Sequence, residues 1–268
     1  MLKFDVPDGS PAMTTQKPPS PRKSLAPTRA LPVFHPLYRQ IKDHMVRSLE
    51  VGEWGPGEVI PSESELAVRF QVSQGTVRKA VDELAAENFL IRRQGKGTFV
   101  ATHDDPRSFY RFLRLMPDEG EAQQVHSHPL SCHKMAAGDE VSAVLGISSD
   151  AEVIHIVRTL NFDEKAVVFD DIYLDADLFP GLALEALQAS ENSLYSFFET
   201  QFGVRMVRAE ERIRAVAASA EIGGSLDLPE GSPLLLVERV AYTYGDRPVE
   251  WRRGFYSTVR HHYLNVLG

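Results

Sequence analysis

The first candidates for chemistry are four polar or basic side chains that follow residue 73. Gln74, Thr76, Arg78 and Lys79 come directly after a serine, which is a favoured helix N-cap. In a helix that begins there, all four lie off the apolar face. Arginine pairs with a guanine edge or a phosphate, and lysine most simply with a phosphate. For any one of these residues the alternative is a solvated helix surface.

Two helices joined by a tight turn are expected to position these side chains. Ser62 and Glu65 have the S-x-x-E spacing of a capping box, which satisfies two backbone N–H groups at a helix start. Residues 71–72 form the expected turn, and Ser73 caps the second helix. The buried side of that helix is predicted to be Val77, Ala80, Val81 and Leu84.

A basic ribbon is expected next, with strands at residues 90–94 and 98–101. Gly95 and Gly97 flank Lys96 and allow a tight turn with a cation at its tip. Further positive charge comes from Arg92 and Arg93. A basic, glycine-rich tip suits a narrow groove of high negative potential. The order of helix, turn, helix and ribbon over residues 61–100 predicts a winged helix-turn-helix that enters DNA grooves.

Composition limits the class of protein. The 268 residues suffice for two domains, and 43% hydrophobic with 25% charged residues is typical of globular proteins. The chain has one cysteine, no N-terminal apolar segment of a secretory signal, and no apolar run near the roughly 20 residues that span a bilayer. These features predict a cytoplasmic protein that does not enter a membrane.

The net charge of −8 is unevenly distributed. Residues 1–31 carry +3, residues 32–102 carry 0, and residues 103–268 carry −11. A neutral module still binds DNA when its cations share one face. It then binds non-specific DNA weakly and depends on base contacts and dimerisation.

Four segments are expected along the chain. Residues 1–31, with six prolines, form a disordered tail. Residues 32–101 form the winged helix-turn-helix, which begins with a helix from Pro36. The apolar stripe of that helix is Leu37, Ile41, Met45 and Leu49. Residues 102–107 form a linker, and residues 108–268 mix strand and helix signals typical of an antiparallel α+β domain.

Residues 36–101 resemble the DNA-binding domain of the GntR family of bacterial transcription regulators. The motifs that carry the resemblance are Pro36-Leu37-Tyr38, Pro61-Ser62-Glu63, Glu65-Leu66-Ala67, Val72-Ser73, Thr76-Val77-Arg78-Lys79-Ala80 and Gly95-Lys96-Gly97-Thr98-Phe99-Val100. The family often has arginine in place of Ser64 and of Gln74, and glycine in place of Asn88. Asparagine adopts the left-handed conformation more readily than most residues. We therefore expect a different operator core, with Gln74 suited to adenine.

The C-terminal part resembles the ligand-sensing UTRA domain of the histidine-utilisation-repressor (HutC) subfamily. Strands are expected at residues 153–160, 167–174, 210–216, 234–244 and 249–256, with a hairpin turn at residues 161–164. Helices are expected at residues 137–145, 193–202 and 218–226. Motifs shared with the subfamily are Leu145-Gly146-Ile147, Ile156-Val157-Arg158, Phe202-Gly203-Val204 and Pro248-Val249-Glu250. The resemblance implies a chorismate-lyase-like fold, a small-molecule effector and a homodimer.

The same resemblance supplies effector-binding candidates. Arg158, Glu250 and Tyr256 match ligand-contacting positions, and Asp170 matches an acidic position after the hairpin. Arginine grips a carboxylate or phosphate bidentately. The alternative for each is an internal salt bridge or a buried tyrosine hydroxyl. Ser127-His128 matches a Ser-Arg pair of phosphosugar-sensing relatives, and the loss of that arginine favours an organic acid, aromatic or imidazole-bearing forms included.

Three other functions are each consistent with part of the sequence. His126, His128, Cys132 and His133 are of metal-ligand type, but Pro129 intervenes and their spacing fits no zinc pattern. The second alternative is a chorismate-lyase-like enzyme fused to a DNA-binding module, but the sequence contains no catalytic motif that supports it. An architectural DNA-binding protein would not need the acidic C-terminal domain. The favoured function is a non-enzymatic, cofactor-free regulator, most simply a repressor. It binds a pseudo-palindromic double-stranded operator as a homodimer and is released by a small molecule.

Overall fold

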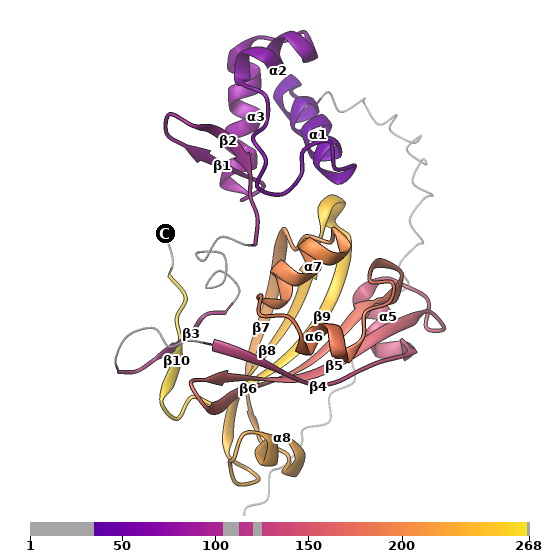
Figure 1. Cartoon of the computed structure of the whole chain (residues 1–268), viewed down its shortest axis with the longest axis vertical. Helices are drawn as coiled ribbons and strands as arrows, with labels where there is room; N and C mark the ends of the chain where they lie inside the picture. The colour runs from indigo at the N-terminus through magenta and orange to yellow at the C-terminus, as the bar shows by residue number, and fades with distance from the viewer. Residues whose placement is uncertain (1–34, 104–112, 120–124, 267–268) are drawn as a thin grey trace, which may run out of the picture. The chain divides into compact units, whose positions relative to one another are not determined.

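The structure, a computed structural model of the chain, describes residues 35–103, 113–119 and 125–266 (Figure 1). The predicted tail, residues 1–31, and residues 104–107 of the predicted linker lie outside these ranges.

Three helices open the described chain: α1 (Leu37–Glu50), α2 (Glu63–Phe70) and α3 (Gln74–Ala86). The predicted capping box is present, with the Ser62 side chain accepting from Glu65 N–H and the Glu65 carboxylate accepting from Ser62 N–H. Ser73 caps α3 by accepting from Thr76 N–H. The turn between α2 and α3 is made by Gln71, whose φ of 55° is left-handed.

Apolar side chains of these helices form one core. It includes Ile41, Met45 and Leu49 of α1, Leu66 of α2, and all four residues predicted for the buried side of α3. The prediction that Leu37 belongs to the buried stripe is wrong, since its side chain is 51% exposed. The buried residues of α1 begin at Ile41, one turn later, so the first turn of the predicted stripe does not reach the core.

A two-stranded antiparallel wing follows, formed by β1 (Leu90–Arg93) and β2 (Gly97–Val100). Leu90 pairs with Val100 and Arg93 with Gly97, so both strands differ from the predicted bounds by about one residue. Asn88 has φ 61°, the left-handed conformation that the sequence suggested.

The sheet of the C-terminal part is antiparallel, as expected, and has six strands in the order β4-β5-β6-β9-β8-β7. The strands are β4 (Val125–Ala136), β5 (Glu152–Phe162), β6 (Lys165–Asp175), β7 (Arg208–Ala217), β8 (Pro233–Tyr242) and β9 (Pro248–Tyr256). The four-residue turn predicted at residues 161–164 is wrong. Phe162 pairs with Lys165, which leaves a two-residue turn in which Asp163 has φ 53°.

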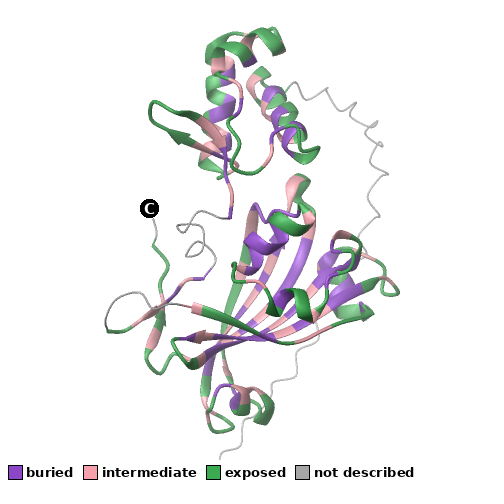
Figure 2. Ribbon diagram, viewed as in Figure 1, coloured by how far each residue is buried: buried purple, intermediate pink, exposed green. Residues whose placement is uncertain are grey.

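Helices cover both faces of this sheet. On one face, α6 (Leu184–Gln188) and α7 (Leu194–Phe202) pack on Ile154, Ile156 and Leu174. On the other, α5 (Gly138–Leu145) packs on Val153 and Trp251. At a separate place on that second face, the segment containing α8 (Ala220–Ser225) packs beside Phe169. Successive residues of β5 face opposite sides of the sheet. Figure 2 shows buried residues concentrated in the central strands and in α7.

Several elements were not predicted. They are the full length of β4, the paired strands β3 (Leu115–Pro117) and β10 (His261–Tyr263), the helix α6, and the 3-10 turns η1 (Ala176–Leu178) and η2 (Tyr244–Asp246). Segments of three to five residues are too short to show a periodicity. In β4, the register shifts between Pro129 and Ser131, which interrupts the alternation that reveals a strand.

Candidate nucleic-acid interface and ligand site

Two of the predicted DNA-contacting side chains at the beginning of α3 differ in their exposure to solvent. Gln74 is exposed, whereas Thr76 is half-buried. The hydroxyl groups of Thr76 and Ser73 lie 2.8 Å apart. The Thr76 hydroxyl is therefore part of the helix cap, and Gln74 is the more accessible of the two.

A groove brings together predicted residues from three elements. Its lining includes Ser64 of α2, Gln74 of α3, and Lys96 and Gly97 at the wing tip. Gly97 has φ +113°, and a Cβ there would lie 3.2 Å from Val59 Cγ2, so the close approach of the wing requires glycine.

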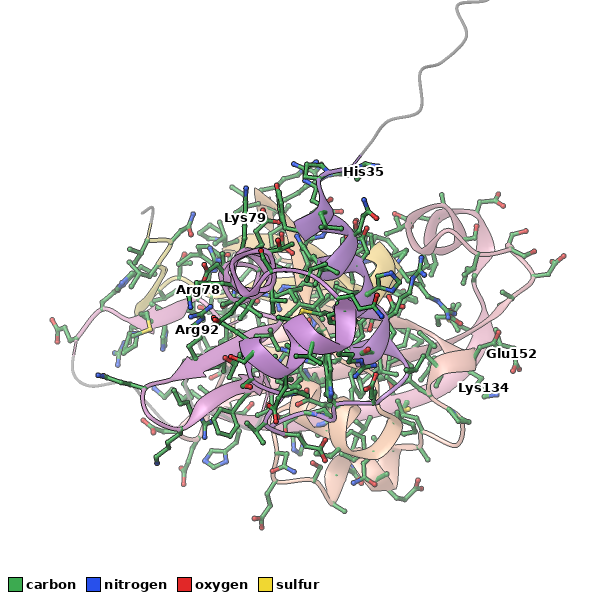
Figure 3. The ribbon with its side chains drawn as sticks, turned by 90° about the horizontal axis from the view of Figure 1, so that it is seen from above. His35, Arg78, Lys79, Arg92, Lys134 and Glu152 are labelled. Carbon is green, nitrogen blue, oxygen red and sulfur yellow. The ribbon has the colours of Figure 1, made fainter. Side chains whose placement is uncertain are left out.

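Two arginines of the candidate interface, Arg78 and Arg92, form ion pairs with the Glu63 carboxylate. Arg78 Nε donates to Glu63 Oε2 at 2.9 Å, and Arg92 Nη2 donates to Glu63 Oε1 at 3.0 Å. Arg92 also pairs with Asp82 at 2.7 Å. Figure 3 shows Arg78 and Arg92 next to each other, with Lys79 farther along. Lys79 Nζ lies 3.9 Å from the ring centroid of Tyr38, a cation–π contact.

Four of the predicted effector-binding residues are buried in one group beneath α7: Arg158, Asp170, Glu250 and Tyr256. Arg158 Nε donates to Asp170 Oδ2 at 2.9 Å, and Arg158 Nη1 donates to Ser127 Oγ at 3.2 Å. Arg252 Nη1 lies 3.4 Å from the same Asp170 oxygen, and Arg252 Nη2 lies 2.9 Å from Glu250 Oε2. Asp170 and Glu250 are fully buried. Two arginines therefore balance two carboxylates away from water, as buried charges require.

Burial also governs the pKa values of this group. It lowers the pKa of the Arg158 guanidinium, although the Asp170 charge opposes this shift. It raises the pKa of Tyr256 to about 12. Tyr195, whose hydroxyl donates to Glu250 Oε1 at 2.7 Å, has its pKa raised for the same reason. Both phenols are thus neutral hydrogen-bond donors at physiological pH.

Tyr256 reaches the group through the close approach of β9 to β6. A Cβ built on Gly254 would lie 2.8 Å from Tyr256 Cε1 and 3.0 Å from Asp170 Oδ1. Asp170 Oδ1 is itself buried and accepts no hydrogen bond from the described residues. A buried acceptor without a donor is costly, so this oxygen is suited to a ligand donor or a water.

A small cavity adjoins Arg158. It is lined by Ser127, Ile156 and Arg158 from the sheet, and by Asn192, Leu194 and Phe197 at the start of α7, among others. Ser193 caps α7 by accepting from Ser196 N–H at 3.2 Å. The N-terminal end of a helix carries partial positive charge, which adds to that of Arg158. The accessible volume is about 10 Å³, room for about one water.

His128 does not join this group. It pairs with Thr159 of β5, whereas Ser127 pairs with Leu160, so the two side chains face opposite sides of the sheet. The possible metal ligands are likewise dispersed. Cys132 packs beneath α6 and α7, and His133 contacts His155 on the other face. Within residues 35–103, 113–119 and 125–266, no three His, Cys, Asp or Glu side chains are placed to hold a metal ion.

Sequence reasoning missed Glu63 as an arginine partner, and it missed Arg252 and Tyr195. Arg252 lies two residues after Glu250, and alternate strand residues share a face. That spacing is a signal that sequence analysis could have used. The pairing of Tyr195 with Glu250 joins α7 to β9 across 55 positions of sequence, and no local pattern predicts it.

An exposed winged helix, joined in one chain to a sheet with a buried charged site, defines a DNA-binding regulator with a ligand-sensing domain. The family model for bacterial regulatory proteins of the gntR family matches residues 37–100, and the UTRA domain model matches residues 121–262. The chain belongs to the GntR family of transcription regulators and carries a UTRA domain. In the described ranges, no helix is both long and apolar enough to cross a membrane.

Individual relatives agree with this assignment. An HTH-type transcriptional regulator of Bacillus subtilis (strain 168), YurK, is 30% identical over 217 residues, covering 80% of this chain and 88% of the relative. The mannosyl-D-glycerate transport/metabolism system repressor MngR of Escherichia coli (strain K12) is 30% identical over 227 residues, covering 83% and 92%. The ligand-binding domain of a GntR-family regulator from Bordetella bronchiseptica is 48% identical, with a TM-score of 0.58, covering 59% of this chain and 99% of that structure.

Proposed function

We propose that this regulator binds a pseudo-palindromic operator as a homodimer and releases it when a small organic acid binds the C-terminal domain. In this proposal the functional units are the winged helix of residues 32–101 and the effector and dimerisation domain of residues 108–268. A linker at residues 102–107 joins them. Repression is the expected outcome, in keeping with relatives that are named repressors.

The observation that carries the effector class is the pairing of Arg158 with the first turn of α7 around one cavity. Asp170 pairs with Arg158 but does not line this cavity, and among the described residues no acidic side chain lines it, so an anionic group is the expected occupant. Asp170 Oδ1 and the Tyr256 hydroxyl then serve polar groups elsewhere on the ligand. MngR is named for mannosyl-D-glycerate, which contains a carboxylate.

Ligand entry also suggests how binding is coupled to DNA release. A cavity with room for about one water admits an organic acid only if the residues that line it move apart. A ligand that favours this displaced conformation shifts the population of the dimer towards it. Release follows when the two winged helices no longer match the two half-sites.

The test combines operator selection with ligand titration. Selected duplex DNA is titrated by fluorescence anisotropy, and carboxylates and sugar phosphates are then added separately. Weakened DNA binding with a carboxylate, accompanied by a raised melting temperature, is expected. Tight binding of a sugar phosphate with no response to carboxylates would overturn the effector class, and DNA binding insensitive to every metabolite would favour an architectural protein.

A matched pair of variants locates the site. Asn192→Asp places a negative charge at the cavity, and Lys134→Gln changes net charge by the same amount at an exposed strand end, where Lys134 pairs with Glu152. Asn192→Asp should weaken carboxylate binding, whereas Lys134→Gln should not. Equal effects of both variants on carboxylate binding would show that the carboxylate binds at another site.

A further inference from the structure

The carboxylate of Glu63 is the point where three elements of the winged helix meet. Glu63 is the first residue of α2, and its side chain is only 17% exposed. One oxygen accepts from Arg78 of α3 and the other from Arg92 of β1. Both oxygens are thus engaged by cations from elements other than its own. Glu63 also lines the groove that contains Ser64, Gln74 and Lys96.

The two arginines remain accessible while they are held. Their side chains are 57% exposed for Arg78 and 43% exposed for Arg92. Their local charge is nonetheless balanced, because Glu63 and Asp82 supply one carboxylate each. A phosphate that approaches either guanidinium therefore competes with a carboxylate already in place, and this reduces the electrostatic gain from any DNA of any sequence.

The geometry of the Arg78 contact has a second consequence. Glu63 engages Nε, and the two terminal amino groups of the guanidinium are not part of this bond. Those terminal groups are the pair that can donate bidentately to the O6 and N7 atoms of guanine. An arginine held at Nε also loses less side-chain freedom when it reaches a base edge.

We infer that Glu63 is a specificity-determining residue, which positions Arg78 for a base edge and at the same time weakens binding to non-specific DNA. This rests on the proposed DNA-binding function and adds to it an acidic residue that acts through two cations. Glu63 is a positioning residue that need not touch DNA.

The test compares Glu63→Gln with Glu53→Gln in the full-length protein. Glu53 also pairs with an arginine of the same domain, Arg69, so each variant replaces an arginine-paired carboxylate with a neutral amide. Binding to a selected operator and to a scrambled duplex of equal length is measured over a range of salt concentrations. For Glu63→Gln we expect tighter scrambled-duplex binding, a salt slope steeper by about one, and an operator preference reduced by about tenfold.

Glu53→Gln should change binding to both duplexes by the same factor and leave the preference intact. An equal loss of preference in both variants, or no loss in Glu63→Gln, would overturn the inference. In an Arg78→Gln background, Glu63→Gln should have little further effect on the preference, and a full effect there would contradict action through Arg78. If the wild-type protein selects no DNA sequence at all, the proposed function itself fails.

A measurement on the wild-type protein covers the case in which Glu63→Gln does not fold. The Arg78 Nε–H signal is followed by nitrogen-15 NMR, free and bound to the operator. Slow hydrogen exchange that persists in the complex supports the retained contact with Glu63. Fast exchange of that proton in the complex would overturn it.

Discussion

Asp170 Oδ2 accepts from Arg158 Nε at 2.9 Å and also lies 3.4 Å from Arg252 Nη1, so one buried oxygen serves two guanidinium groups. Strands β5, β6 and β9 each contribute one of these residues. The ion pairs at the centre of the proposed effector site therefore also link three strands of the sheet.

Asp170→Asn should destabilise the C-terminal domain strongly. The amide cannot balance Arg158 and Arg252, and an unpaired buried charge costs about 3–5 kcal/mol. Urea unfolding monitored by circular dichroism measures the change. Asp150→Asn, an exposed residue, should leave the unfolding midpoint unchanged. Equal midpoints for both variants would mean that water reaches Arg158 and replaces the carboxylate.

Gly254→Ala should also destabilise the sheet. The new methyl group would lie 2.8 Å from Tyr256 Cε1 and 3.0 Å from Asp170 Oδ1, and relief of such overpacking costs about 1–3 kcal/mol. Gly224→Ala is the control, because nothing lies within 4 Å of its added Cβ and it occupies a helix. Thermal unfolding should show a loss for the first variant and no loss for the second. A neutral Gly254→Ala would show that Tyr256 shifts freely.

Ser73→Ala should destabilise the winged helix by about 1 kcal/mol, since it removes the acceptor for Thr76 N–H at the start of α3. Ser64→Ala provides the comparison within the same motif, because Ser64 is inside α2 and caps nothing. Chemical unfolding followed by Trp54 fluorescence, with Trp251→Phe in both proteins, reports on this core. A similar loss in both variants would point to a cause other than capping.

Asp171 should contribute pH-dependent stability. Burial alone raises its pKa, but hydrogen bonds from His155 and Arg253 and the Arg253 charge outweigh this and lower it. A carboxyl whose folded pKa is lowered stabilises the fold fully above its unfolded pKa, near 3.9, and loses that contribution as pH falls through the folded pKa. The wild-type protein should thus be more stable than Asp171→Asn at neutral pH, with the difference shrinking below about pH 4.

Urea unfolding at a series of pH values checks the Asp171 prediction. Glu152→Gln removes one partner of the exposed pair with Lys134 and should show almost no difference at any pH. A stability gap for Asp171→Asn that stays constant down to the lowest pH would exclude titration of this carboxyl as its cause.

Gln74→Arg should change the preferred operator. Gln74 is exposed at the start of α3 and lines the groove beside Ser64 and Lys96. Glutamine suits adenine and arginine suits guanine, and each such pairing discriminates by about 1–3 kcal/mol. Binding-site selection with both proteins should return consensus sequences that differ at one position of each half-site. Identical consensus sequences would remove Gln74 from the base-reading set.

Local sequence signals accounted for the winged helix. Ser62, Glu65 and Ser73 fix helix starts through bonds to residues three positions away, and the apolar spacing of α3 fixes its buried face. Such short-range interactions are written in consecutive residues, so pattern and structure agree. They failed at Leu37, because burial depends on how far the neighbouring helices extend.

Local sequence signals could not predict the contacts between residues that are far apart in the chain. The register of β4 places Ser127 beside Arg158 and turns His128 to the other face, and the shift at Pro129 obscures this from the sequence. Arg252 and Tyr195 join the buried group through strand order and helix packing, which bring together residues far apart in the chain.

The sequence by itself determined the winged helix, the antiparallel character of the second domain and the family, because capping, periodicity and motif spacing are local. Only the tertiary structure decided which charges face each other. It placed Glu63 between Arg78 and Arg92, and Asp170 between Arg158 and Arg252. Electrostatic pairing depends on distance in space and on burial, and both quantities exist only once the chain has folded.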